Sequence, residues 1–149
     1  MRIWIDADAC PREVKDVVFR AAERRRVPVT LVANKTLSIP RSALISLVQV
    51  SGGPDEADHR IVQDAQPGDL AITADIPLAA RLVPRQVAVI GPRGEVFDEQ
   101  NIGERLSVRD FLADIRDAGT MTGGPAAYSA RDKQRFASAL DATLHRLNT

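Results

Sequence analysis

The sequence predicts a three-layer α/β/α fold, in which helices cover a mainly parallel sheet of about five strands and further C-terminal helices follow. Short apolar segments alternate with helical segments from the N-terminus to Gly94, which is typical of βαβ units. Several of these segments are apolar throughout, as expected for strands that are buried on both faces. The length of 149 residues fits one domain, over residues 1–149, with no linker to divide it.

Five segments have the composition of short buried strands. They span residues 2–6, 28–33, 43–50, 69–73 and 86–90. Clusters of Gly and Pro close the third and the fifth of them, at residues 51–54 and 91–94, and such clusters mark turns. A short extension at residues 95–97 follows the last turn.

Five segments have helical patterning, at about residues 11–26, 54–65, 75–83, 102–118 and 129–147. Pro11 suits the first position of a helix, and Asp75 suits an N-cap. Asp132 follows Ser129 by three residues, which predicts reciprocal capping of the last helix. A small-residue loop at residues 119–124 precedes that helix, and its Gly123-Gly124-Pro125 end either approaches a ligand or merely breaks the chain.

Composition and charge exclude several classes of protein. Twenty basic residues balance twenty acidic ones, so the chain is not a strongly basic nucleic-acid binder. The apolar runs are too short for a transmembrane helix, and we expect no membrane partner. The single Cys10 cannot form an internal disulfide, which suits a reducing compartment and predicts a cytoplasmic protein.

Polar and acidic residues follow four of the predicted strands. They are Asp6 and Asp8 after the first, Asn34 and Lys35 after the second, Asp55, Glu56 and Asp58 after the third, and Thr73 and Asp75 after the fourth. Ligands of open parallel sheets bind at the carboxyl ends of the strands. The sequence therefore predicts an acidic functional site at this edge.

Clustered carboxylates remain ionised together when cations lie between them. Mg²⁺ or Mn²⁺ suits an all-oxygen site. Zinc is less suitable, because it prefers Cys and His ligands and the chain has only one Cys and two His residues. The candidate metal ligands are Asp6, Asp8, Asp55, Asp58 and Asp75. Metal ions in acidic pockets commonly serve phosphate chemistry.

Each acidic residue also has a purely structural interpretation. Asp6 and Asp8 could form a capping turn before the first helix, and Asp75 could simply cap its own helix. Asp55 and Asp58 would complement a helix dipole. Cys10 is either a thiol nucleophile at a helix N-terminus or a small residue packed in a loop.

The sequence also resembles a known family in several motifs. Its opening run from Ile5 to Pro11 (IDADACP) resembles the first motif of the bacterial YaiI/YqxD family. Further segments are similar to the remaining motifs of that family, namely VANK at residues 32–35, GPDEAD at 53–58, GDLAITADIPLA at 68–79 and TGGP at 122–125. The resemblance covers nearly the whole chain.

The resemblance implies a PIN-like nuclease fold with an acidic metal site that cuts phosphodiesters, often in RNA. The first-strand aspartate of that superfamily corresponds to Asp6, and its Thr-x-Asp motif to Thr73-Ala74-Asp75. Its mid-chain acid corresponds to Asp55 or Asp58.

Three hypotheses follow. The first is a nuclease or phosphodiesterase in which Asp6, Asp58, Asp75 and Thr73 are catalytic around Mg²⁺ or Mn²⁺, and Asn34, Lys35 and Cys10 bind the substrate. The second is a non-catalytic module that binds nucleic acid or protein. The third is a phosphatase of the haloacid-dehalogenase type, which the Asp6-Ala7-Asp8 run superficially resembles although no Gly-Thr follows it.

Overall fold

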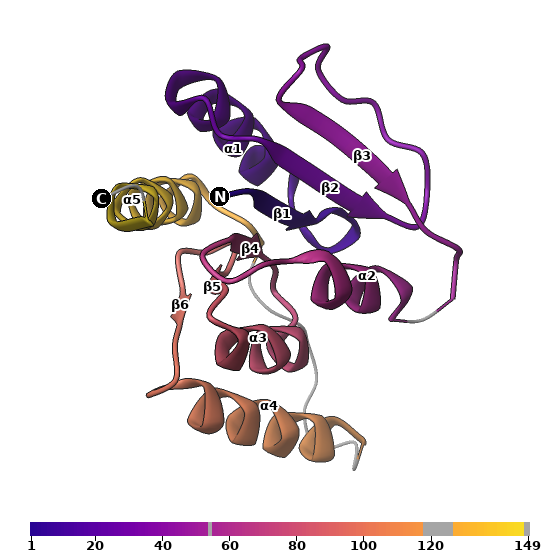
Figure 1. The fold of residues 1–149 in the computed structure, drawn as a ribbon. Helices are drawn as coiled ribbons and strands as arrows, with labels where there is room; N and C mark the ends of the chain where they lie inside the picture. Colours follow the sequence, from indigo (N-terminus) through magenta and orange to yellow (C-terminus); the bar gives the residue numbers. More distant parts are fainter. Residues whose placement is uncertain (54, 118–126, 148–149) are drawn as a thin grey trace.

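The computed structural model describes residues 1–53, 55–117 and 127–147, which form a six-stranded sheet between layers of helices (Figure 1). The strands are β1 (Ile3–Asp6), β2 (Val29–Ala33), β3 (Ile45–Gln49), β4 (Leu70–Ile72), β5 (Ala88–Ile90) and β6 (Val96–Phe97). The helices are α1 (Arg12–Arg25), α2 (Glu56–Asp64), α3 (Ile76–Leu82), α4 (Ile102–Asp117) and α5 (Ala130–Leu147). Short 3₁₀ turns, η1 (Ala7–Ala9) and η2 (Val83–Arg85), follow β1 and α3. The predicted α/β/α architecture is confirmed.

The strand order is β3-β2-β1-β4-β5-β6. Strand β1 pairs in parallel with β2 on one side and with β4 on the other, and β6 alone runs antiparallel. The chain builds outward from β1 to β3 and then restarts at β4 beside β1. The boundary between β1 and β4 is therefore the topological switch point, where open α/β sheets bind their ligands.

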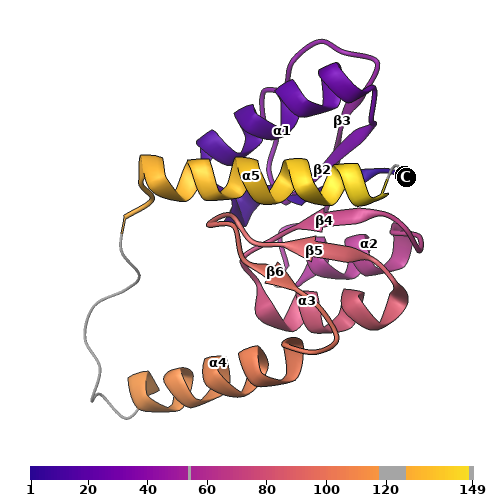
Figure 2. The ribbon, with the colours of Figure 1, turned by 90° about the vertical axis from the view of Figure 1, so that its left-hand side faces the viewer.

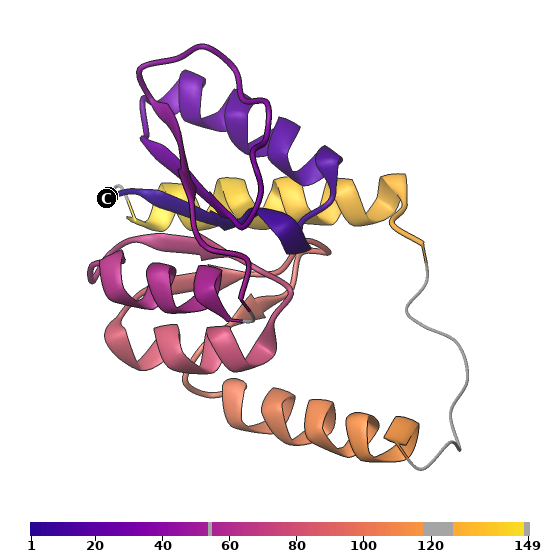
Figure 3. The same cartoon turned by 90° about the vertical axis from the view of Figure 1, so that its right-hand side faces the viewer.

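Successive side chains of β1 point to opposite faces of the sheet, and each face has its own core layer. Ile3 and Ile5 pack with α1 and α5, whereas Trp4 between them packs with α2 and α3 on the other face. Helix α5 lies in front of the sheet in Figure 2, and α2 and α3 lie on the viewer's side in Figure 3. All four residues of β1 are buried, as expected for a central strand covered on both faces.

Helix α4 lies outside α3 and packs mainly against it (Figures 2 and 3), and its first turns reach the sheet only at its edge, where the Arg105 guanidinium lies 5.6 Å from the ring centroid of Phe97 in β6. Two of its apolar side chains, Val108 and Phe111, are 51% and 62% exposed. None of the helices in the described ranges is both long enough and apolar enough to cross a membrane.

Two details differ from the elements predicted from sequence. The extension at 95–97 contains a sixth strand, because Val96 and Phe97 find partners in Ile90 and Val89 and Phe97 is buried against the α3 side of the core. The helix after Asp75 ends at Leu82 and tightens into η2. Pro84 lacks the N–H that a continuing helix would need at that position.

Asp69 supports the sheet at the opposite edge from the predicted site. It is 7% exposed and immediately precedes β4. Its Oδ2 accepts hydrogen bonds from Trp4 Nε1 at 3.0 Å and from Gln66 N at 2.9 Å, and its Oδ1 accepts one from Arg2 N at 3.0 Å. This carboxylate thus joins the starts of β1 and β4 with the turn before β4, and its role is structural.

We expect Asp69→Ala to lower the free energy of unfolding by about 3 kcal/mol, because three donors in a mostly buried setting lose their acceptor. Urea denaturation followed by Trp4 fluorescence measures this loss. The control is Asp64→Ala, which removes only the surface ion pair with Arg60 and should cost under about 1 kcal/mol. Equal losses in the two variants would contradict a structural role for Asp69.

Candidate functional site

The candidate site lies at the carboxyl ends of β1 and β4, at the switch point of the sheet. Asp6 is the last residue of β1, and Asp8 belongs to the η1 turn after it. Asp75 precedes α3, and Asp58 lies in the first turn of α2. The carboxyl end of β1, the loop after β4 and the start of α2 therefore supply acids to one place.

Thr73 joins two of these acids. Its side chain is fully buried, and its Oγ1 donates a hydrogen bond to Asp6 Oδ2 at 2.9 Å. The same Oγ1 accepts a hydrogen bond from Asp75 N at 3.0 Å. One hydroxyl thereby fixes the Asp6 carboxylate and the backbone at Asp75, which places both at the switch point.

Asp75 caps α3 as the sequence predicts. Its Oδ1 accepts a hydrogen bond from Leu78 N at 3.0 Å, which satisfies one of the unpaired donors in the first turn. The alternative capping role for Asp6 and Asp8 is wrong. Helix α1 begins after Pro11, and no side chain caps it. Asp75 therefore has both a structural and a candidate functional role, whereas Asp6 has no capping role.

The acids of this site perturb one another. The pKa of Asp58 is raised to about 7, and burial is the largest cause. The negative charges of Asp75 and Asp6, a hydrogen bond between the Asp58 and Asp75 carboxyl groups, and the charge of Asp55 raise it further. Burial also raises the pKa of Asp6, and the nearby charges of Asp75 and Asp8 add to this, whereas the hydrogen bond from Thr73 acts in the opposite direction. The described residues leave this negative charge uncompensated, so the site favours binding of a proton or a cation.

Asp8 contacts the loop after β2. Its Oδ2 accepts a hydrogen bond from the Asn34 backbone N–H at 2.8 Å, so the contact involves the backbone of Asn34 and not its amide side chain. Lys35 follows in the same loop, is exposed and forms no ion pair with the described residues. The structure thus brings Asp8, Asn34 and Lys35 to the same end of the sheet as Asp6.

Asp55 lies at the rim. It is exposed and adopts a left-handed backbone conformation, with φ of 64°, directly before α2. Its charge contributes to the raised pKa of Asp58, although it is the smallest of the causes. Of the two mid-chain acids, Asp58 therefore has the stronger coupling to Asp6 and Asp75.

Cys10 lies inside the protein. Its thiol donates a hydrogen bond to Ile72 O at 3.7 Å, and the residue is 8% exposed. Burial raises the pKa of this thiol to about 12, with a further contribution from the charge of Asp6. The thiol is protonated at neutral pH, which favours the packing role over the nucleophile.

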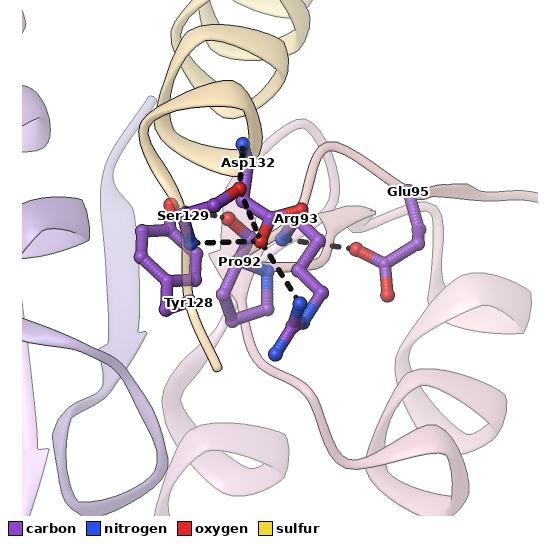
Figure 4. A network of polar contacts seen from close by, with 6 residues as sticks. All are labelled: Pro92, Arg93, Glu95, Tyr128, Ser129 and Asp132. Atoms are coloured by element: carbon purple, nitrogen blue, oxygen red, sulfur yellow. Dashed lines mark hydrogen bonds and ion pairs between the residues drawn. The ribbon is translucent and has the colours of Figure 1, made fainter. Parts of the chain in front are cut away.

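The start of α5 also lies at this edge, and Ser129 and Asp132 form the reciprocal cap there that the sequence predicts. Figure 4 shows the Asp132 carboxylate between Ser129 and Arg93. Asp132 Oδ2 accepts hydrogen bonds from Ser129 N at 3.0 Å and from Arg93 Nη1 at 2.9 Å, while Asp132 N donates to Ser129 Oγ at 3.2 Å. The predicted Ser129–Asp132 capping of α5 is confirmed. These bonds, with the Ser129 backbone bond as the largest contribution, lower the pKa of Asp132.

Tyr128 and Arg93 are the residues that sequence reasoning missed. Tyr128 Oη donates to Pro92 O at 2.8 Å, and the Arg93 guanidinium lies over the tyrosine ring, 5.8 Å from its centroid. They meet across 35 residues of chain, and no local pattern predicts such a contact.

The turn between β5 and β6 requires glycine at Gly94, because φ is +92° and a Cβ atom would lie 2.9 Å from the Arg135 backbone. Gly123-Gly124-Pro125 lies outside the described residues.

No three His, Cys, Asp or Glu side chains within residues 1–53, 55–117 and 127–147 lie close enough together to form a complete metal-binding group. The donor set is nevertheless suited to a hard cation. Mg²⁺ commonly takes one or two carboxylates and completes its shell with water and substrate phosphate. The adjacent Asp58 and Asp75 supply such a pair, and Oδ1 of Asp6 accepts no hydrogen bond from the described residues.

Comparison with known proteins identifies the family. A family model described as "Uncharacterized BCR, YaiI/YqxD family" matches residues 4–146. The chain belongs to this family. The resemblance seen in the sequence motifs is thereby confirmed, whereas membership of the PIN-like superfamily remains a prediction.

Relatives in the YaiI/YqxD family match nearly the whole of this chain. A UPF0178 protein of Myxococcus xanthus is 58% identical over 147 residues, which is 99% of this chain and 96% of the relative. A UPF0178 protein of Bordetella parapertussis is 56% identical over 146 residues, covering 98% and 91%. One from Geobacter sulfurreducens is 53% identical over 148 residues, covering 99% and 98%. No solved structure matches the chain.

We expect the Asp58 carboxyl to titrate near pH 7 in a ¹³C NMR titration. Between about pH 4 and pH 7 the native state then binds more protons than the unfolded state, so this group destabilises the protein as pH rises. Asp58→Asn should therefore gain stability relative to the wild type over that window and show a constant advantage above it. In Asp75→Asn the pKa of Asp58 should fall, because a neighbouring charge is removed. Titration of Asp58 near its ordinary value of 3.8 would contradict the proposed coupling.

Proposed function

We propose that this chain is a divalent-metal-dependent phosphodiesterase of the cytoplasm that cleaves nucleic acid, with RNA as the first substrate class to test. One observation carries the proposal. Asp6 and Asp75 are fixed by the buried hydroxyl of Thr73 at the switch point of the sheet, and Asp58 is hydrogen-bonded to Asp75 from the start of α2. The lone, reduced Cys10 is consistent with a cytoplasmic location.

Asp6, Asp58 and Asp75 would hold Mg²⁺ or Mn²⁺, and the charges of Asp8 and Asp55, which act on Asp6 and Asp58, would add to the attraction for the cation. The raised pKa of Asp58 supports this assignment, since a cation would relieve the repulsion that keeps its proton bound. When bound, the metal would lower the pKa of a bound water and stabilise negative charge on the phosphate.

The remaining residues of the site would position the substrate. Thr73 holds the Asp6 carboxylate in one orientation through its 2.9 Å hydrogen bond, so this ligand is ordered before the substrate arrives. Exposed Lys35 lies in the loop that Asp8 holds through Asn34. Its ammonium group is available for a phosphate that flanks the scissile bond, and such contacts supply most of the affinity for nucleic acid.

The test compares Mn²⁺ binding by calorimetry with cleavage of a labelled single-stranded RNA, in wild type, Asp58→Asn and Asp75→Asn. We expect saturable Mn²⁺ binding by the wild type. Loss of a residue that only supports a metal ligand lowers metal affinity or activity roughly 10–100-fold. Because Asp58 and Asp75 would be ligands themselves, each variant should lose more than this. Asn is a good N-cap, so Asp75→Asn should keep α3 folded.

The matched control is Asp64→Asn, which changes a carboxylate at the other end of the same helix as Asp58. It should leave metal binding and cleavage unchanged. Metal-independent binding of RNA without cleavage would instead favour the non-catalytic module. Cleavage that survives unchanged in Asp75→Asn would remove this residue from the mechanism.

A further inference from the structure

A small pocket opens beside the acidic site, on the side of β5. Its walls come from four segments that are distant in sequence and meet at the carboxyl edge of the sheet. They include Ala9, Pro11, Ala74, Pro92, Arg93 and Tyr128. Ala74 lies between Thr73 and Asp75, and Ala9 follows Asp8. The pocket therefore shares two loops with the site that would hold the scissile phosphate.

The walls are mostly carbon. Two alanines, two prolines and the Tyr128 ring line the pocket, with the Arg93 guanidinium and the Glu95 carboxylate as its charged groups. Arg93 is paired with Asp132, and Glu95 Oε1 accepts a hydrogen bond from Arg93 N at 3.0 Å. Such a pocket suits a flat ligand that carries no charge of its own, and it does not suit a phosphate.

The volume is about 200 Å³, which is below the roughly 300–1,000 Å³ of pockets for drug-sized ligands. It has room for one ring system. The hydrogen bond from Tyr128 Oη to Pro92 O and the ion pair between Arg93 and Asp132 hold two of its walls in place (Figure 4). A ligand would thus meet walls that are already ordered, which reduces the entropy lost on binding.

We propose that this pocket binds one unpaired nucleobase of a single-stranded nucleic acid whose phosphate lies at the acidic site. The inference rests on the proposed function and narrows its substrate class. Every base offers an aromatic face to a ring such as Tyr128, and this contact tolerates any sequence. A base that is paired inside a duplex cannot leave its stack without an energetic cost. The pocket therefore selects single strands over duplexes.

The experiment measures binding of fluorescein-labelled oligouridine, oligothymidine and a hairpin duplex in buffer that contains Ca²⁺, because the acidic site repels phosphate unless a cation is bound. Gel electrophoresis after each titration verifies that the oligonucleotide is intact. Tyr128→Ala should weaken binding of both single strands about tenfold, in line with loss of one stacked base. It should leave the weaker binding of the hairpin unchanged. Tyr128→Phe keeps the ring and should bind single strands within about threefold of the wild type.

Two further variants control for damage to the fold. Ala9→Leu adds bulk to the pocket from another, exposed lining residue and should also weaken single-strand binding, without any change at Tyr128. Phe111→Ala removes an aromatic ring from the exposed face of α4 and should have no effect. Wild-type binding in both Tyr128→Ala and Ala9→Leu would overturn the proposal, as would equal affinity for hairpin and single strand, or no binding of any oligonucleotide.

The same variants separate this inference from the proposed catalysis. If the wild type binds single strands through Tyr128 but cleaves none of them, the result supports the base pocket and contradicts the proposed phosphodiesterase activity. If the wild type cleaves RNA and Tyr128→Ala binds and cleaves it identically, the result supports the phosphodiesterase activity and contradicts the base pocket.

Discussion

The hydrogen bond from the Thr73 hydroxyl to the Asp6 carboxylate is the interaction around which the carboxyl edge of the sheet is organised. Both residues are almost completely removed from water, and buried polar groups need partners. Because Thr73 Oγ1 also accepts the Asp75 N–H, the same hydroxyl determines where α3 starts. The ends of two neighbouring strands and the beginning of a helix are thus fixed by one side chain.

Among the residues that the structure describes, none compensates the negative charge of Asp6, Asp58 and Asp75 at this edge. Asp58 lies in the first turn of α2, where the helix dipole favours a negative charge by about 0.3–1 kcal/mol. Its pKa is nevertheless raised to about 7 by burial and by Asp75 and Asp6, so these effects outweigh the dipole. Asp69, at the opposite edge, accepts three hydrogen bonds from donors of the surrounding chain. Asp69, whose carboxylate is satisfied by hydrogen-bond donors, is therefore a structural acid. Asp6, Asp58 and Asp75, which repel one another, are instead suited to binding a cation.

Much of the fold and part of the site follow from the sequence. The alternation of apolar and helical segments predicts the parallel sheet, because each βαβ unit must bury the same two faces. The strand-end rule predicts Asp6, Thr73, Asp75 and Asp58 at one edge, where hydrogen bonds and charge effects link them. The cap at Asp75 and the Ser129–Asp132 capping follow from local spacing. The antiparallel β6 does not follow, since a two-residue strand depends on its neighbour rather than on its own composition.

The sequence by itself determined the layers, the parallel strands and the residue types at the carboxyl edge, because periodicity and turn chemistry act over a few neighbouring residues. Only the tertiary structure decided which of those residues interact. It buried the Cys10 thiol against Ile72, coupled Asp58 more strongly than Asp55 to the other acids, and seated Tyr128 beside Arg93 and Pro92. Burial and charge coupling depend on distances between segments that are far apart in the chain, and no local pattern encodes those distances.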